Sequence, residues 1–570
     1  MSWRDAMCGE LRADDAGRRV TVAGWADTRR DHGGLVFVDL RDHTGKVQLV
    51  VNPEHSAAAA ETAHEIRNEF VLQAVGEVVA RAPELVNPNL PTGQIEVQVD
   101  ELRILSRSTP LPFQLDEENV DESLRLRYRW LDMRTERMQR NLRLNHTAIS
   151  AIRRVMDERE FVDVWTPSFT RGTPEGARDF LTPVRLQPGK FFALAQSPQL
   201  FKQLCMVGGI DRYYQIATCW RDEDLRADRG FEFRQLDLEM AFVEREEVLD
   251  VMEACVVAAF EAAGVDPPQR PFPHLSYADA MLRYGSDKPD LRFGLEIQDA
   301  TEVTRDSEFG VFKNAPCVRY VAVPRTFSRS EQSRLEELAK EWGAKGLANL
   351  TQISKFLSER ELQAFGVEEG STALFVADEE ETVARVLGFL RLHLAHELDL
   401  IGAEDVFHWV VDFPLFKVSE EFGGWTFMHH PFTAAVPGEE ELIEADPAHV
   451  HGQHYDLIWN GWELGSGSIR IHESPVQEAV FRVMGMGEEE QRDKFGFLLD
   501  ALQMGAPPHG GFAMGIDRFI ALLAREPDIR QVTAFPKVAS GSDPLTGAPT
   551  AYPDSALKEL GIRLLDPQPE

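Results

Sequence analysis

The stretch WRDEDLRADRGFEFRQLDLEM, at residues 220–240, decides the fold of this chain. It places Arg221 two residues before Glu223, and Phe233 four residues before Asp237. On a β-hairpin, these positions supply a planar guanidinium for a phosphate, a carboxylate for an adenine amino group and an aromatic face for the base. The stretch therefore predicts a nucleotide-binding hairpin.

Three motifs of the chain resemble those of the class II aminoacyl-tRNA synthetases. The 220–240 stretch resembles motif 2, the ATP-binding hairpin, and GGFAMGIDR at residues 510–518 resembles motif 3, a Gly-rich strand that runs into a helix carrying an arginine. FVDVWTP at residues 161–167 resembles motif 1, in which a long helix and a strand form the dimer interface. The resemblance implies an enzyme that activates an amino acid with ATP and acts as a homodimer.

Length and composition indicate a multidomain chain with an acidic surface. At 570 residues it is too long for one hydrophobic core, so about two to four domains are expected. No apolar run approaches the roughly 18 residues of a membrane span and no signal pattern opens the chain, so we expect a cytoplasmic protein without a membrane partner. The five cysteines are scattered without CxxC spacing, which suits a reducing compartment and argues against zinc.

The net charge of −34 bears on whether the chain can bind an RNA. Contacts to phosphates need Lys and Arg, so this charge counts against non-specific RNA binding. Charge acts locally, however, and an acidic protein can carry a basic groove. The composition therefore does not exclude a specific tRNA.

Patterning along the chain predicts a multidomain α+β fold. Residues 1–107 show five short strands with an Ala-rich helix after the third, the order of an OB-fold β-barrel that binds single-stranded nucleic acid. A Pro-marked and acidic linker or hinge follows at residues 108–135. Residues 136–293 and 399–570 form the antiparallel-sheet catalytic domain that the class II resemblance implies. Residues 294–398 interrupt it with their own strands and helices, as an inserted α+β domain.

The whole chain resembles the bacterial type of the aspartyl-tRNA synthetases, of subclass IIb, and an insertion at this location is the mark of that type. The resemblance implies ligation of L-aspartate to the 3′ end of tRNA(Asp) through an aspartyl-adenylate. It is carried by the three motifs and by TPEGARDF (173–180), QSPQLFKQ (196–203), YGSDKPDLRF (284–293), HHPF (429–432) and GWELGSGSIRIH (461–472).

The residues that would bind aspartate follow from this resemblance. Arg470 and Lys202 match positions that grip the side-chain carboxylate, and a guanidinium with an added point charge suits that task. We expect asparagine to leave these two buried cations under-compensated. Taken alone, Lys202 would more often be a surface lysine. The resemblance further implies aspartate contacts from Glu175, Ser197, Gln199, Arg221, Asp237, His429 and His430.

The nucleotide residues are implied in the same way. Arg221 would bridge the α-phosphate and the attacking carboxylate, with Glu223 and Arg518 as the other catalytic residues. Asp456 and Glu463 supply hard oxygen ligands for Mg²⁺. The full set of implied ATP-binding residues is Arg221, Asp222, Glu223, Phe233, Glu463, Gly515, Ile516, Asp517 and Arg518.

One departure from the family pattern bears on ATP. Members of the family usually carry Gln-Pro after the equivalent of Asp228 and Arg229, whereas this chain has Gly230 and Phe231. Because the glutamine contributes an ATP contact, the departure predicts weaker ATP binding without loss of activity.

In the barrel, Arg30, Phe37 and Gln48 match positions that read the anticodon, and Phe37 can stack on an unpaired base. His32 is typical of relaxed enzymes that charge both tRNA(Asp) and tRNA(Asn), whereas Leu85 stands where relaxed enzymes have a glycine. Our hypothesis is relaxed recognition, and strict specificity for tRNA(Asp) is the alternative. A tRNA-binding paralogue without activity is a further alternative, but it would be expected to lack one of Arg221, Glu223, Glu463 or Arg518, and all four are present.

Overall fold

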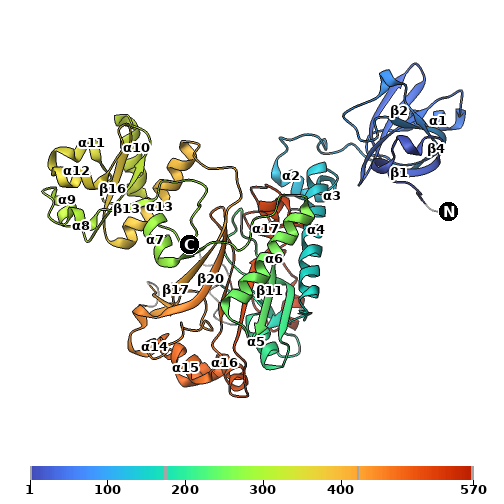
Figure 1. Ribbon diagram of the computed structural model, residues 1–570. Coiled ribbons are helices and arrows are strands. Elements are labelled where there is room, and N and C mark those ends of the chain that lie inside the picture. The colour runs from blue at the N-terminus through green and yellow to red at the C-terminus, as the bar shows by residue number, and fades with distance from the viewer. Residues whose placement is uncertain (1–2, 173–176, 420–422, 566–570) are drawn as a thin grey trace. The chain divides into compact units, whose positions relative to one another are not determined.

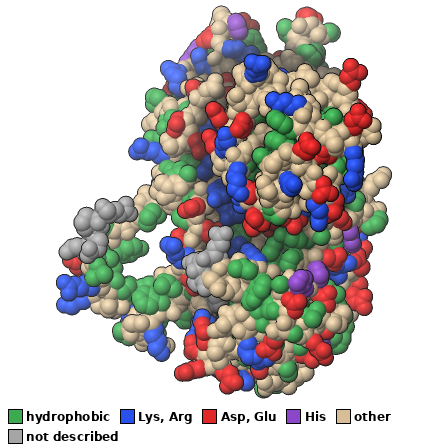
Figure 2. Space-filling view, turned by 90° about the vertical axis from the view of Figure 1, so that its left-hand side faces the viewer, with side chains coloured by type: hydrophobic (Ala, Val, Ile, Leu, Met, Phe, Trp, Pro, Cys, Tyr) green, Lys and Arg blue, Asp and Glu red, His purple; other side chains and the backbone are tan. Residues whose placement is uncertain are grey.

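The computed structural model describes residues 3–172, 177–419 and 423–565, and it divides into two compact units, Met1–Arg140 and Asn141–Glu570. Figure 1 traces both along the chain. No helix in the described part of the chain is long and apolar enough to cross a membrane. Figure 2 shows acidic and basic side chains mixed over the face that it draws, so the acidic total does not make that face uniformly negative.

The first unit confirms the predicted OB-fold. Its five strands close into a barrel in the order β1-β2-β3-β5-β4, with α1 (Ala57–Glu65) between the third and fourth. Alternate residues of each strand point into the core, which is why the sequence alternates apolar and polar residues there. The barrel strands are β1 (Arg19–His32), β2 (Leu35–Asp42), β3 (Gly45–Val51), β4 (Val71–Ala80) and β5 (Ile95–Ser106).

The segment after the barrel, predicted as a linker, contains two short helices, α2 (Glu122–Arg127) and α3 (Arg129–Asp132). Asp121 caps α2 by accepting a hydrogen bond from the backbone of Ser123. The long helix expected from Glu136 onward is α4 (Glu136–Glu158). The predicted domain boundaries themselves remain predictions.

The second unit is built on an eight-stranded sheet, ordered β12-β17-β20-β21-β22-β11-β10-β6. Its six central strands pair antiparallel, as the class II resemblance implied, and only the two edge strands pair parallel. The strands are β6 (Val162–Asp163), β10 (Arg212–Trp220), β11 (Glu232–Ala241), β12 (His274–Ser276), β17 (Phe407–Pro414), β20 (His451–Trp459), β21 (Trp462–Ile469) and β22 (His509–Gly515).

One face of this sheet is covered by α4, α6 (Arg245–Ala263) and α17 (Ile516–Leu523), which bury the largest apolar core of the chain (Figure 1). On β11, Leu236, Leu238 and Met240 point into that core. Because side chains alternate along a strand, Asp237 and Glu239 point to the opposite face. The apolar residues of the hairpin thus fix the sheet, and its polar residues are directed to one site.

Outside the inserted segment described below, this unit contains further strands and α-helices. They are β7 (Phe169–Thr170), β8 (Leu181–Pro183), β9 (Phe191–Leu194), β18 (Phe416–Val418), β19 (Trp425–Phe427), α5 (Gln199–Val207), α7 (Tyr277–Tyr284), α14 (Leu442–Ala445), α15 (Ser474–Val483), α16 (Glu488–Leu502) and α18 (Asp554–Glu559).

Between α7 and β17 the chain forms a four-stranded sheet, ordered β13-β14-β16-β15, with its own apolar clusters. The predicted strands and helices of the insertion are present, and the structure adds short elements that the sequence pattern did not reveal. The elements are β13 (Ile297–Asp299), β14 (Cys317–Val323), β15 (Ala348–Asn349), β16 (Thr372–Asp378), α8 (Thr301–Thr304), α9 (Gly310–Lys313), α10 (Arg329–Glu341), α11 (Leu350–Ile353), α12 (Glu359–Phe365) and α13 (Glu380–Glu397).

Candidate active site

A cavity of about 350 Å³ lies on the polar face of the sheet, where β11, β21 and β22 run side by side. It brings together residues from Ser197 to Ile529, which lie 332 positions apart in the sequence. The predicted site residues that line it are Ser197, Gln199, Lys202, Arg221, Glu223, Phe233, Asp237, His429, His430, Glu463, Arg470, Gly515, Asp517 and Arg518.

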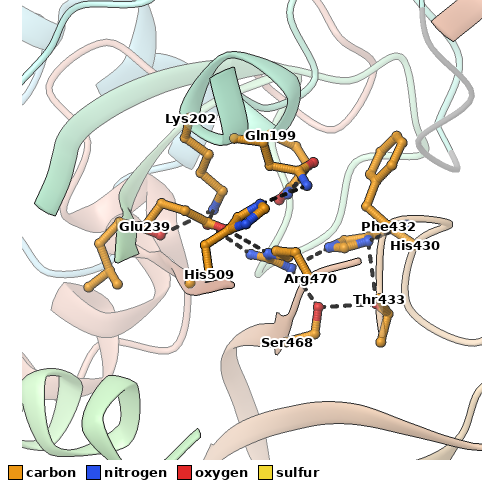
Figure 3. Close-up of polar contacts among 12 residues, drawn as sticks. Gln199, Lys202, Glu239, His430, Phe432, Thr433, Ser468, Arg470 and His509 are labelled. Atoms are coloured by element: carbon orange, nitrogen blue, oxygen red, sulfur yellow. Dashed lines mark hydrogen bonds and ion pairs between the residues drawn. The ribbon is translucent and has the colours of Figure 1, made fainter. Parts of the chain in front are cut away.

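A buried ion cluster forms the inner end of this cavity, and Figure 3 shows its members converging on Glu239. Lys202 Nζ lies 3.2 Å from Glu239 Oε2 and donates to Asp237 Oδ2 at 3.1 Å. The Arg470 guanidinium donates to both oxygens of Glu239, at 2.9 and 3.2 Å. Burial alone would raise the pKa of Glu239, but the Arg470 and Lys202 charges outweigh it and lower that pKa.

Glu239 is a functional residue that sequence reasoning missed, and it changes the charge count of the site. Lys202 and Arg470 were expected to be two under-compensated cations when asparagine is bound, but they already share one buried anion between them. Gly511 makes room for this carboxylate, because a Cβ there would lie 1.9 Å from Glu239 Oε2. The alternation of Gln235, Asp237 and Glu239 with apolar residues along the strand was the available signal.

Asp237 presents an open acceptor to the cavity. Its Oδ1 is buried and has no hydrogen-bond partner among the described residues, while Oδ2 accepts from Lys202. Burial raises the pKa of Asp237 to about 6, against the opposing pull of Lys202. A buried carboxylate oxygen without a partner is costly unless a ligand supplies the donor, and an ammonium group would do so.

His429 and His430 lie beside the ion cluster, with ring centroids 4.2 Å apart. Nε2 of His430 lies 2.5 Å from an Arg470 nitrogen, so Nε2 is the unprotonated acceptor. Burial holds the pKa of both histidines well below 6.5, and the nearby positive groups add to that effect. Both are therefore neutral near pH 7 in this structure.

The outer end of the cavity carries the arginines expected to bind the nucleotide. The Arg221 guanidinium lies over the Phe233 ring, 5.1 Å from its centroid. Arg518 donates to Asp228 Oδ2 at 2.9 Å and to the backbone carbonyl of Glu463. The Nε atoms of Arg221 and Arg518 are buried and have no partner among the described residues. Each guanidinium thus keeps donor capacity for a ligand.

Four of the predicted site residues differ from the others in where the structure places them or in what their side chains contact. Ile516 is fully buried in the core beneath α17, so its side chain does not reach the cavity. Asp222 lines a neighbouring cavity with Arg178 instead. Asp517 reaches the cavity, but its carboxylate is already bound by the backbone and side chain of Arg234. Glu175 lies outside the described residues.

Asp456 and Glu463 occupy the paired strands β20 and β21, as the hypothesis of a Mg²⁺ site requires. Burial raises the pKa of Asp456 to about 6 against the opposing effect of His454, whose Nε2 lies 2.6 Å from Asp456 Oδ1, and the Glu463 carboxylate adds to the rise. No cluster of three or more metal-ligating side chains occurs in the part of the chain that the structure describes. Two carboxylates still fit Mg²⁺, which keeps several waters and commonly takes its other ligands from phosphates.

At the family departure, the two residues point in different directions. Gly230 lines the cavity, and a Cβ there would come no closer than 3.3 Å to its neighbours. The Phe231 ring packs edge-to-face on Phe180 instead, at a centroid distance of 5.3 Å. Of the two, only the residue at position 230 could extend toward a nucleotide.

In the barrel unit, the three predicted anticodon residues lie on adjacent strands. Arg30 on β1 donates to both oxygens of Asp39 at 3.0 Å and to Gln48 on β3 at 3.3 Å. Phe37 on β2 pairs with Arg30 across the strands, and its ring meets His32 edge-to-face at 5.8 Å. His32 is exposed and Leu85 is 64% exposed. Asp39, which orients Arg30, was not recognised from the sequence.

Comparisons with known proteins agree with this geometry. The family of tRNA synthetases class II (D, K and N) matches residues 121–539, and the OB-fold nucleic acid binding domain matches residues 20–105. The chain is 48% identical to the Aspartate--tRNA ligase of Geobacillus kaustophilus, with 100% of both chains covered. It is 46% identical to the Aspartate--tRNA(Asp/Asn) ligase of Natranaerobius thermophilus, over 98% of this chain and 99% of the relative.

A solved structure supports the fold alone. The asparaginyl-tRNA synthetase of Pyrococcus horikoshii, complexed with asparaginyl-adenylate, superposes with a TM-score of 0.61 at 20% identity, covering 93% of this chain and 97% of the other. Together, the sheet, the cavity on its polar face and the matched regions show that this chain belongs to the class II tRNA synthetases of the D, K and N group.

Proposed function

We propose that the chain is an aspartate--tRNA ligase that forms aspartyl-adenylate from L-aspartate and ATP and then transfers aspartate to tRNA. The observation that carries the proposal is the charge balance at the inner end of the cavity. Lys202 and Arg470 share Glu239, and Lys202 also pairs with Asp237, so an ammonium bound to Asp237 leaves one positive charge of the cluster in excess. Asp237 offers its open oxygen to an ammonium. L-aspartate supplies that ammonium and one side-chain carboxylate for the excess charge.

In the first step, the α-carboxylate of aspartate attacks the α-phosphorus of ATP and pyrophosphate leaves. Arg221 neutralises the charge that develops between the two reacting groups, and Arg518 with Phe233 holds the nucleotide. The 3′-hydroxyl of the terminal adenosine then attacks the carbonyl carbon and AMP leaves. Positioning and electrostatics supply the catalysis, and no protein nucleophile takes part.

Asp456 and Glu463 would hold Mg²⁺, which would supply charge neutralisation at the phosphates of ATP. Ser197, Gln199 and Glu175 would complete the surroundings of the aspartate ammonium. His429 and His430 would cover the bound amino acid. Each of these roles follows from the family resemblance together with the donor chemistry at its position.

Aspartate-dependent ATP–pyrophosphate exchange tests this proposal. We expect exchange with L-aspartate and a preference over L-asparagine of at least about 10³-fold in kcat/KM, because a neutral amide leaves the excess positive charge unpaired. Comparable exchange with both amino acids would contradict the charge argument. No exchange with either would contradict the catalytic assignment.

Relaxed recognition of both tRNA(Asp) and tRNA(Asn) is the finer proposal. It rests on His32, whose ring packs against Phe37 beside the predicted anticodon residues. Side-by-side charging of the two tRNAs by one enzyme preparation measures it, with Leu85→Gly as the companion variant. Charging of tRNA(Asp) alone would establish the strict alternative, and gain of tRNA(Asn) charging in the variant would assign the restriction to Leu85.

A homodimer is the proposed assembly. Exposed large apolar side chains occur in motif 1 and in the small sheet that follows it. Trp165 is 87% exposed, Leu181 and Phe191 are exposed on one face of the sheet of β7, β8 and β9, and Phe169 is exposed on the other. Exposed apolar side chains in this number are typical of an interaction surface. Light scattering should give twice 64.3 kDa, and Trp165→Glu should shift the protein to the monomer.

A further inference from the structure

Lys288 contacts Glu463, which lines the nucleotide end of the cavity, and has no part in the chemistry proposed above. It follows α7 in the YGSDKPDLRF segment, and its Nζ lies 3.3 Å from Glu463 Oε2. The same Nζ lies 3.3 Å from Asp287 Oδ1. Its side chain is 44% exposed, so the ammonium is free to move once a better partner arrives.

The backbone around Lys288 is held from two sides. Gly285 packs so closely on α13 that a Cβ there would lie 2.1 Å from the carbonyl oxygen of Ala384. On the other side, Gly461 in the β20–β21 turn packs on Asp290, where a Cβ would lie 3.0 Å from the Asp290 Cβ. Arg391 of α13 also donates to the Asp290 carbonyl at 3.2 Å. These contacts hold the backbone of the segment in a position from which the Lys288 side chain reaches Glu463.

Lys288 lies between two carboxylates. Asp287 Oδ1 and Glu463 Oε2 are each 3.3 Å from its Nζ, while Asp456, the other residue of the hypothesised Mg²⁺ site, lies 2.6 Å from His454 Nε2. Arg518 donates to the carbonyl of Glu463 and to Asp228, which leaves the Glu463 carboxylate to Lys288 among the described residues. The position where the lysine ammonium lies is thus next to a carboxylate that would hold Mg²⁺.

We propose that Lys288 acts as the counter-ion of Glu463 in the nucleotide-free enzyme and gives way when the metal enters with ATP, so that metal binding depends on the nucleotide. An ammonium and a divalent cation compete for the same carboxylate oxygen. A metal ion that arrives alone must displace Lys288 without offering it a new partner. A metal–ATP complex brings phosphate oxygens that accept the displaced ammonium. This role presupposes the ATP-dependent function proposed above.

Binding of Mn²⁺, followed by electron paramagnetic resonance, tests this role without relying on turnover. We expect Lys288→Gln to bind Mn²⁺ about fivefold more tightly than the wild type when no nucleotide is present. The same variant should bind a non-hydrolysable ATP analogue about fivefold more weakly, by calorimetry with Mg²⁺ present. Lys288→Arg keeps the charge and should stay close to the wild type in the first measurement.

The matched control is Lys494→Gln, which removes a surface lysine paired with Glu490 at 2.7 Å on α16 and should change neither affinity. Glu463→Gln should abolish binding of Mn²⁺ to the protein, which would assign the bound Mn²⁺ to this site. Equal Mn²⁺ affinity in the wild type and Lys288→Gln would overturn the role of Lys288, as would tighter Mn²⁺ binding in Lys288→Arg. Absence of aspartate-dependent exchange in the wild type would instead count against the proposed function, while the nucleotide-free Mn²⁺ titration would still report on Lys288.

Discussion

The two ends of the cavity differ in how their charges are paired. At the aspartate end, Lys202, Glu239 and Arg470 are almost fully buried and already bound to each other. At the nucleotide end, Arg518 pairs with Asp228, and each side chain is 23% exposed. Buried ion pairs tolerate no loss of a partner, whereas exposed pairs exchange partners at small cost. Aspartate would therefore bind where the ion pairs of the protein are already formed. ATP would bind where the charged side chains can exchange their present partners for its phosphates.

Glu239→Gln should produce the largest effect, because it leaves Lys202 and Arg470 buried with one partner too few. We expect the free energy of unfolding to fall by about 3–5 kcal/mol, measured by urea denaturation. Glu490→Gln, at an exposed pair on α16, is the control and should stay within about 0.5 kcal/mol. A loss below about 1 kcal/mol for Glu239→Gln would mean that water reaches the cluster.

Arg221→Lys tests the nucleotide end and should leave stability nearly unchanged. A lysine cannot reproduce the planar fork that bridges phosphate and carboxylate, so kcat of aspartate-dependent exchange should fall by about 10²-fold. Arg226→Lys, on the same hairpin but in the neighbouring cavity, serves as the control. Unchanged kcat with a raised KM for ATP would limit Arg221 to ground-state binding.

The pKa of about 6 at Asp237 predicts a pH dependence of aspartate binding. Because this pKa is raised above the ordinary 3.8, the buried carboxyl holds a proton below about pH 6 and loses it above. The substrate ammonium needs the ionised form, so aspartate affinity should drop about tenfold per pH unit below pH 6. The same shift makes the ionised Asp237 a destabilising charge in the free protein above about pH 6.

Calorimetric titration of aspartate between pH 5 and 7.5 measures how the affinity for aspartate changes with pH. It also measures the proton that should be released on binding at the low-pH end of this range. His430→Gln should keep the slope, because the pKa of His430 already lies well below 6.5. A flat profile would show that Asp237 is ionised throughout this range.

Gly230→Gln should give the smallest effect and act only at the nucleotide end. A Cβ at position 230 would lie 3.3 Å from the backbone carbonyl oxygen of Glu232, so a side chain fits once that carbonyl moves slightly, and the added amide should lower the KM for ATP about threefold. Gly230→Ala adds the Cβ without the amide and is the control. Equal KM values for all three enzymes would contradict the predicted loss of an ATP contact in this chain.

Most residues that line the cavity were predicted from the sequence, but several of the contacts between them were not. Motif 2 supplied Arg221, Phe233 and Asp237, yet Glu239 on the same strand was overlooked although it alternates with apolar residues. Ile516 was included because it belongs to motif 3, but the turn into α17 directs it into the core. Lys288 was part of a recognised segment, and its contact with Glu463 spans 175 positions of sequence.

Local sequence by itself predicted the barrel, because strand alternation and apolar spacing are properties of neighbouring residues, and the resemblance of the motifs implied the antiparallel sheet. The motifs likewise identified the family. Only the tertiary structure decided which ions share partners, since the charge of a buried group depends on residues brought in from distant segments. Gly511 opposite Glu239 illustrates this: the glycine is visible in the sequence, but the carboxylate that requires its missing Cβ is not.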